Sequence, residues 1–146
     1  QIERDALAWA VGEVKPEEID KVNILHASFL AMHRAIAQLQ VTPEALIIDG
    51  NRFDPYPGLP HTCIVKGDGK YLSIAAASIL AKTYRDDRMH ALHEQYPFYD
   101  WIHNAGYPTL RHRQGILSHG LTPHHRLTFG GLGEPTLPFA EEEEPR

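Results

Sequence analysis

One aspartate stands where a strand is expected to end. The segment ALIIDGNRFD, residues 45–54, places Asp49 after four apolar residues and directly before Gly50. A carboxylate inside a buried strand is unfavourable unless it is paired or binds a metal, whereas open α/β sheets bind ligands in the crevice beyond the carboxyl ends of their strands. The alternative is an ordinary turn-forming Asp-Gly pair, which is the more frequent case for such a dipeptide taken alone. Asp49 is therefore a candidate metal ligand whose role depends on its neighbours.

A second acidic position lies on the longest expected helix. Asp86 and Asp87 are adjacent there, and Asp86 follows Ile79 by seven residues, on the same stripe as Lys82 and Met89. Periodicity alone does not decide which of the two carboxylates faces inward. An adjacent pair of aspartates on a helix usually lies on a solvated face, so this signal is weak without further context.

Histidines are frequent in the last third of the chain, but their spacing does not favour a zinc site. No cysteine accompanies them, and the adjacent pair His124 and His125 must point in different directions. Buried or phosphate-facing roles are the better interpretation for this group, which comprises His103, His112, His119, His124 and His125.

The elements that must position these residues alternate between strand and helix. Alternation of bulky side chains predicts a strand over residues 6–14, and three-and-four spacing predicts an amphipathic helix over residues 23–40 with Asn23 as its cap. Short apolar runs predict buried strands at 45–48 and 62–66, separated by a loop rich in proline and glycine.

The second half of the chain is expected to be helical. Residues 73–95 contain neither proline nor glycine and form the strongest helix pattern in the sequence. Beyond Tyr96, short helical pieces alternate with Gly, Pro and His, which predicts a small helical lobe. Residues 135–146 have little to bury and are predicted to be disordered.

Composition agrees with one globular domain and leaves a nucleic-acid partner possible. The chain has 146 residues, 42% of them hydrophobic, with a single cysteine and no long apolar run, which argues against a membrane span and predicts a cytoplasmic location. The net charge is −5, but five glutamates and one arginine give residues 134–146 a charge of −4. Residues 1–133 therefore carry only −1, and local basic clusters remain compatible with DNA or RNA.

Six sequence blocks decide between these readings. In chain order they are NILHASFLAMHRAIAQL, LIIDGN, IVKGD, SIAAASILAKTYRD, GYPT and HHRLTF. Together they resemble the ribonuclease HII family, the type 2 ribonucleases H, over nearly all of residues 1–129. Thr128, where many members have serine, is a minor departure.

The resemblance implies an α/β fold like that of ribonuclease H, with a mixed sheet flanked by helices and a small carboxyl-terminal helical lobe. On this basis the chain divides into a catalytic core over 1–95, a substrate-contacting lobe over 96–133 and an acidic disordered tail over 134–146. The resemblance also implies amino-terminal strands that this sequence lacks.

Four carboxylates hold the metals in that family. By motif, Asp49 matches the third and Asp86 the fourth, so both are expected to be catalytic metal ligands. The first two form an Asp-Glu pair in a glycine-rich block on the first strand, and no such block occurs in this sequence. We therefore expect the sequence to correspond to the carboxyl-terminal part of the enzyme.

The implied reaction is hydrolysis of the RNA strand of RNA/DNA hybrids and cutting at ribonucleotides embedded in duplex DNA. Hard oxygen ligands suit Mg or Mn ions, one activating the attacking water and the other stabilising the leaving oxygen. Two alternatives stay open: a fragment that packs or binds hybrid duplex without cutting, and another nuclease of the same superfamily. The complete protein is expected to be a monomer without a membrane partner.

Substrate contacts are expected from four further side chains. The resemblance places Tyr107, in GYPT, against the sugar at the junction of RNA and DNA, where the 2′-hydroxyl marks ribose. The alternative is a tyrosine that only fills the small lobe. Lys66, Lys82 and Arg85 are candidates for phosphate contacts, or else for ion pairs with nearby aspartates.

Overall fold

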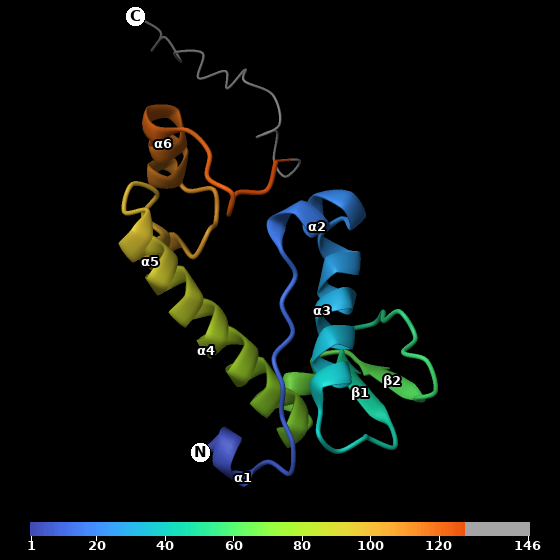
Figure 1. The fold of residues 1–146 in the computed structure, drawn as a ribbon. Helices are drawn as coiled ribbons and strands as arrows, with labels where there is room; N and C mark the ends of the chain where they lie inside the picture. The colour runs from blue at the N-terminus through green and yellow to red at the C-terminus, as the bar shows by residue number, and fades with distance from the viewer. Residues whose placement is uncertain (128–146) are drawn as a thin grey trace, which may run out of the picture.

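The computed structural model describes residues 1–127 (Figure 1). The described part of the chain contains two strands and several helices arranged along the longest helix. In chain order the elements are α1 (Ile2–Asp5), α2 (Pro16–Val22), α3 (Ile24–Gln38), β1 (Leu46–Asp49), β2 (His61–Ile64), the short 3-10 helix η1 (Gly67–Gly69), α4 (Leu72–Gln95), α5 (Trp101–Asn104) and α6 (Leu110–His119).

The two strands form a parallel pair that ends at the candidate aspartate. Their register aligns Leu46 with His61 and Asp49 with Ile64. The strand predicted at 62–66 is found slightly earlier, because Lys66 takes the left-handed conformation that begins η1. The strand predicted at 45–48 is confirmed.

A hydrophobic core joins this sheet to α3. Ile48 from β1 packs with Phe29 from α3 and with Phe53 from the loop after β1. The predicted cap of α3 is present, since the side chain of Asn23 accepts a hydrogen bond from the backbone N–H of His26. The sequence therefore predicted where α3 starts.

An ion pair between Glu18 and Arg34 links α2 to α3. Arg34 donates to both carboxylate oxygens of Glu18 and to the backbone carbonyl of Glu13. The hydrogen bond from Arg34, followed by one from the backbone N–H of Lys15, lowers the pKa of Glu18 to about 2. This geometry is bidentate, which is the stronger form of an arginine-carboxylate contact.

The prediction of a strand over residues 6–14 is wrong for the structure described. The segment is extended but has no ladder partner among residues 1–127, and Leu7 is 97% exposed. It passes between α3 and α4 (Figure 1): a side chain at Gly12 would collide with the carbonyl oxygen of Ala31 on α3, and Trp9 packs against Tyr84 on α4. Gly12 and Trp9 thus meet different helices, and Leu7, two residues before Trp9, is exposed, so the alternation of bulky residues does not mark one buried side.

Helix α4 connects the sheet to the helices at the end of the described chain. At 1.5 Å per residue its 24 residues span about 36 Å. Its first turns contact η1 and β1, and its far end contacts α5, with α6 beyond (Figure 1). The predicted helix over 73–95 and the helical character after Tyr96 are both confirmed.

The proposed division of the chain at residues 95 and 96 coincides with the end of α4 but remains a prediction. The tail predicted over 134–146 lies outside the described residues. Among residues 1–127, no helix combines the length and the apolar character that a membrane crossing needs.

Candidate active site

Asp49 lies at the carboxyl end of β1, as the sequence predicted. Its Oδ1 accepts a hydrogen bond of 2.9 Å from the backbone N–H of Gly67. The residue itself is exposed, and within residues 1–127 its other oxygen, Oδ2, accepts no hydrogen bond. The carboxylate is thus oriented through one oxygen while the other can meet a ligand.

The turn that holds Asp49 requires glycine at position 67. A side chain there would come within 2.6 Å of the Cδ1 atom of Ile74, on the first turn of α4. Gly67 is buried, and the preceding Lys66 has φ 55° and ψ 40°. Close packing of this turn against α4 therefore presents the N–H group to the end of β1.

Asp68 is a further carboxylate on the turn that binds Asp49, and it was not among the residues predicted from the sequence. It directly follows Gly67, so its Cα lies about 3.8 Å from that of the residue whose N–H binds Asp49. Asp68 is exposed, and its Oδ1 accepts a hydrogen bond from the N–H of Gly69 at 3.0 Å. The signal available was the IVKGD block itself, in which a second aspartate follows the next strand of the same parallel pair.

Asp86 is the more enclosed of the two adjacent aspartates on α4. Its side chain is 44% exposed and forms an ion pair of 3.0 Å with Lys82, one helical turn earlier. Asp87 lies on the exposed face, where its charge contributes to raising the pKa of Tyr84, after the larger effects of a hydrogen bond to Glu3 and of burial. Of the two carboxylates that periodicity did not distinguish, Asp86 is therefore the less exposed.

The structure does not bring the predicted ligands together into a complete metal centre. Fourteen residues of α4 separate Leu72 from Asp86, a rise of about 21 Å, whereas Asp49 is bound at the turn just before that helix. Within residues 1–127, no three side chains of His, Cys, Asp or Glu are grouped to hold an ion. Carboxylates are suitable donors for Mg or Mn, but residues 1–127 group too few of them to complete such a centre.

Tyr107 is presented on a loop between α5 and α6. Its side chain is 65% exposed, and the guanidinium carbon of Arg85 lies 5.8 Å from the centre of its ring. Arg85 also donates to the backbone carbonyl of Ala105 at 2.8 Å. Gly106, with φ +88°, makes the turn into Tyr107 in a conformation that favours glycine.

The buried side chain of Asn104 stabilises this loop by hydrogen bonds. It is buried, and its side-chain amide donates to the carbonyl of Tyr99 and to the hydroxyl of Thr109, while its Oδ1 accepts from the N–H of Gly106. The N–H of Tyr107 donates to the carbonyl of Asn104 at 2.9 Å. The backbone around Tyr107 is consequently fixed by contacts that are buried or half-buried.

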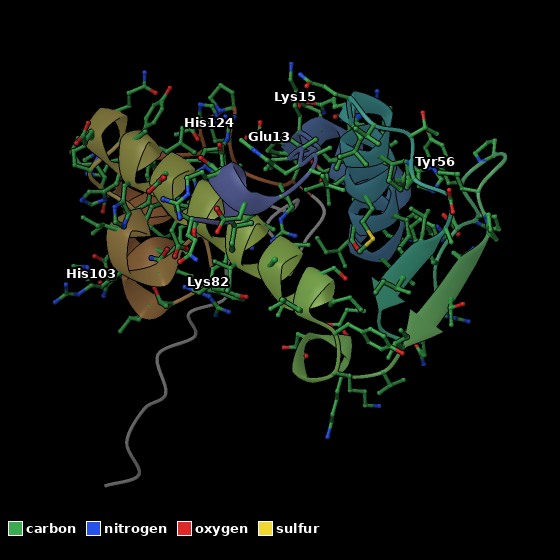
Figure 2. The ribbon with its side chains drawn as sticks, turned by 90° about the horizontal axis from the view of Figure 1, so that it is seen from below. Glu13, Lys15, Tyr56, Lys82, His103 and His124 are labelled. Carbon is green, nitrogen blue, oxygen red and sulfur yellow. The ribbon has the colours of Figure 1, made fainter. Side chains whose placement is uncertain are left out.

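The three candidate phosphate ligands differ in their present contacts. Lys82 is paired with Asp86 and extends from α4 toward solvent (Figure 2). Arg85 is engaged with the loop before Tyr107, as described above. Lys66 is exposed, in the left-handed turn directly before Gly67. Only Lys66 therefore lies next to the turn that binds Asp49.

The histidine-rich region forms a buried polar cluster in the helical lobe. His112 and His125 are buried with their Nε2 atoms 3.1 Å apart. His103, at the outer edge of the lobe (Figure 2), instead pairs with Asp100 at 2.6 Å. The interpretation of some of these histidines as buried residues is confirmed for His112 and His125.

Comparison with known proteins identifies the relatives of the chain. Residues 2–131 match the sequence profile of the family described as Ribonuclease HII. The chain is 69% identical to the ribonuclease HII of Bacteroides thetaiotaomicron over 136 residues, which is 93% of this chain and 68% of that protein. It is 71% identical to that of Parabacteroides distasonis over 139 residues, 94% of this chain and 70% of that protein.

Solved structures support the fold class. The ribonuclease H2 of Pyrococcus horikoshii matches with a TM-score of 0.67 at 24% identity, covering 82% of this chain and 64% of that one. The ribonuclease HII of Archaeoglobus fulgidus, solved in complex with PCNA, matches with a TM-score of 0.60 at 24% identity, covering 85% and 67%. The predicted α/β fold is therefore confirmed, although the described residues contribute only the parallel pair of strands. The chain belongs to the ribonuclease HII family, a family of ribonuclease H-type endoribonucleases.

Proposed function

We propose that the complete protein hydrolyses the RNA strand of RNA/DNA hybrids and cuts at ribonucleotides embedded in duplex DNA. The observation that carries this proposal is Asp49 at the end of β1, oriented by the N–H of Gly67, in a chain that matches the family over residues 2–131. The chain spans about two thirds of its relatives' length, so the proposal concerns the whole protein.

Divalent Mg or Mn ions are the cofactors that this chemistry requires. Asp49 is the first ligand we propose, with a second carboxylate from Asp68 or from Asp86. The position of Asp68 beside Gly67 favours it as the companion of Asp49, while the motif favours Asp86. The remaining ligands are proposed to come from the Asp-Glu block that the resemblance implies and this sequence does not contain. Clustered carboxylates repel one another without a cation, so metal binding should order the site.

Substrate recognition is proposed to involve the exposed ring of Tyr107. Its position on a fixed loop allows it to pack against one sugar without rearrangement, and the 2′-hydroxyl is the group that distinguishes ribose. Lys66, Lys82 and Arg85 are proposed as phosphate contacts, which supply affinity without reading sequence. Lys82 and Arg85 would have to exchange their present partners to do so.

The test is cleavage by the complete protein of a duplex that contains one ribonucleotide. We expect cutting with Mg or Mn, none with a chelator, and none of the matching all-DNA duplex. Asp49→Asn keeps an oxygen that can accept from Gly67, so it should fold normally while activity falls at least about 100-fold. Binding without metal-dependent cutting would instead support the alternative, a protein that only holds hybrid duplex.

A further inference from the structure

Two buried histidines in the helical lobe have no part in the proposed metal chemistry. His112 on α6 is 5% exposed and His125, in the segment after α6, is 6% exposed. Buried polar atoms are nearly always hydrogen-bonded, and the partner of one imidazole nitrogen determines which nitrogen carries the proton. The contacts of this pair therefore define both tautomers.

The assignment starts at His125. Its Nδ1 lies 3.0 Å from the backbone N–H of Thr122, which can only donate, so Nδ1 is an acceptor and the ring proton is on Nε2. The Nε2–H group of His125 faces Nε2 of His112 at 3.1 Å. His112 Nε2 must accept this bond, and the indole N–H of Trp101, at 3.4 Å, points to the same acceptor.

The chain of hydrogen bonds ends on the loop that carries Tyr107. With Nε2 an acceptor, the proton of His112 is on Nδ1, which donates to the backbone carbonyl of Tyr107 at 2.9 Å. The same carbonyl accepts from the N–H of Thr109 at 2.8 Å. Donation thus runs from Thr122 through both imidazoles to Tyr107, and it requires both rings to be neutral.

The surroundings favour the neutral rings. Burial, followed by the nearby imidazole of His112, lowers the pKa of His125 to about 4. The ring of Tyr99 packs edge-on against His125 and that of Trp101 packs at a tilt, with centroids 4.8 and 5.1 Å from that of His125. A proton on either ring would put two N–H groups against each other or against the N–H of Thr122.

We propose that His112 and His125 are positioning residues for Tyr107, fixing the peptide from which its ring is presented to the sugar. The inference rests on the proposed role of Tyr107 in substrate recognition. His112 supplies one of the two bonds to the Tyr107 carbonyl, and His125 holds His112 in the tautomer that can donate. Without the second bond, the peptide at Tyr107 can rotate and the ring loses its fixed position.

Substitutions at His112 test the role in the complete protein. His112→Leu removes the donor, whereas His112→Asn keeps an amide N–H near the position of Nδ1. On a duplex with one ribonucleotide, His112→Leu should lower kcat about tenfold with KM changed by about twofold or less, since misplacement of a positioned group affects turnover most. His112→Asn should recover most of the loss.

A matched control separates positioning from general stability of the lobe. Tyr99→Phe removes the hydrogen bond of 2.8 Å from the Tyr99 hydroxyl to the carbonyl of Gly120, in the same lobe and without touching Tyr107. It should lower the melting temperature while kcat stays unchanged. An equal loss of kcat in Tyr99→Phe and His112→Leu, or an unchanged kcat in His112→Leu, would overturn the proposal.

The tautomers can be measured without any activity. The complete protein is labelled with nitrogen-15 in its histidines and studied by long-range nitrogen-proton NMR. The spectra should show His112 protonated on Nδ1 and His125 protonated on Nε2. Finding His112 protonated on Nε2 would overturn the proposal even if the protein cuts normally. If the wild-type protein does not cut, the proposed function fails, while these spectra still decide whether the hydrogen-bond chain exists.

Discussion

The end of the sheet and the helical lobe present functional groups in opposite ways. At the sheet, Asp49 and Asp68 are exposed, and each has one hydrogen bond from a backbone N–H within the Gly67–Gly69 turn. In the lobe, the backbone at Tyr107 is held by Asn104 and His112, both buried. The proposed metal ligands are thus exposed, whereas the proposed substrate contact lies on a hydrogen-bonded loop, with α4 between the two regions (Figure 1).

The difference follows from the charge of the groups concerned. Burying carboxylates would require partners that compete with a metal, and grouping them raises their mutual repulsion. A tyrosine ring carries no charge, so its loop can be fixed in advance by neutral hydrogen bonds. We expect the side chains of Asp49 and Asp68 to become ordered when metal binds, and the loop of Tyr107 to keep its conformation.

The largest effect should come from the second carboxylate. Asp68→Asn should lower cleavage by the complete enzyme at least about 100-fold, because it removes the carboxylate that we propose as the companion ligand of Asp49. Asp86→Asn should reduce it less, and Asp87→Asn, the matched exposed neighbour, should have almost no effect. The measurement is single-turnover cleavage at saturating metal. If Asp86→Asn lost cleavage activity and Asp68→Asn kept it, Asp86 would be the second metal ligand, as the sequence motif predicts.

Tyr107→Ala should affect cutting more than binding. Removing the ring takes away a contact to one sugar, while phosphate contacts that supply most affinity remain. We expect about a tenfold loss of kcat at a single embedded ribonucleotide, with duplex affinity nearly unchanged. Binding about tenfold weaker with normal turnover at saturation would make Tyr107 a binding residue only.

Stability of the lobe should depend on pH through His125. Its pKa is lowered from 6.5 to about 4, so between these values the unfolded chain binds more protons than the folded one. The free energy of unfolding should therefore fall as the pH drops through this window, by at most about 1.4 kcal/mol per pH unit. Urea unfolding at pH 7, 6 and 5 measures it, with His125→Gln as the comparison. If the free energy of unfolding changed equally with pH in the wild type and in His125→Gln, the prediction would be contradicted.

The smallest effect is expected at Lys82. Its ion pair with Asp86 is exposed, and such pairs contribute about 0–1 kcal/mol, so Lys82→Gln should hardly change the melting temperature. If Lys82 also contacts a phosphate, the salt dependence of duplex binding should decrease by about one unit of slope. Unchanged salt dependence would leave the ion pair as its only role.

Local patterns predicted much of the fold. The periodicity of residues 23–40 and 73–95 predicted α3 and α4, and the apolar run before Asp49 predicted β1. The extended segment over 6–14 was misassigned because a strand is defined by its partner, and alternation of bulky side chains does not show that a partner is present among residues 1–127.

The site was predictable only in part for a similar reason. Asp49 directly follows a clear apolar run, whereas Asp68 lies between two glycines, and its only signal in the sequence is that it follows the next strand. The bonds from Asn104 and His112 to the loop of Tyr107 depend on how α5, α6 and the following segment pack together. No periodic pattern encodes such contacts.

The central claim is that Asp49 binds a catalytic metal, and it is tested most directly by Mn binding to the complete protein. Calorimetric titration should give a dissociation constant at least about tenfold weaker for Asp49→Asn than for the wild type, with the two melting temperatures in the absence of metal nearly equal. Asp54→Asn, an exposed aspartate on the loop after β1 that pairs with His26, is the control and should bind Mn normally. Equal Mn affinity in Asp49→Asn and the wild type would contradict the account.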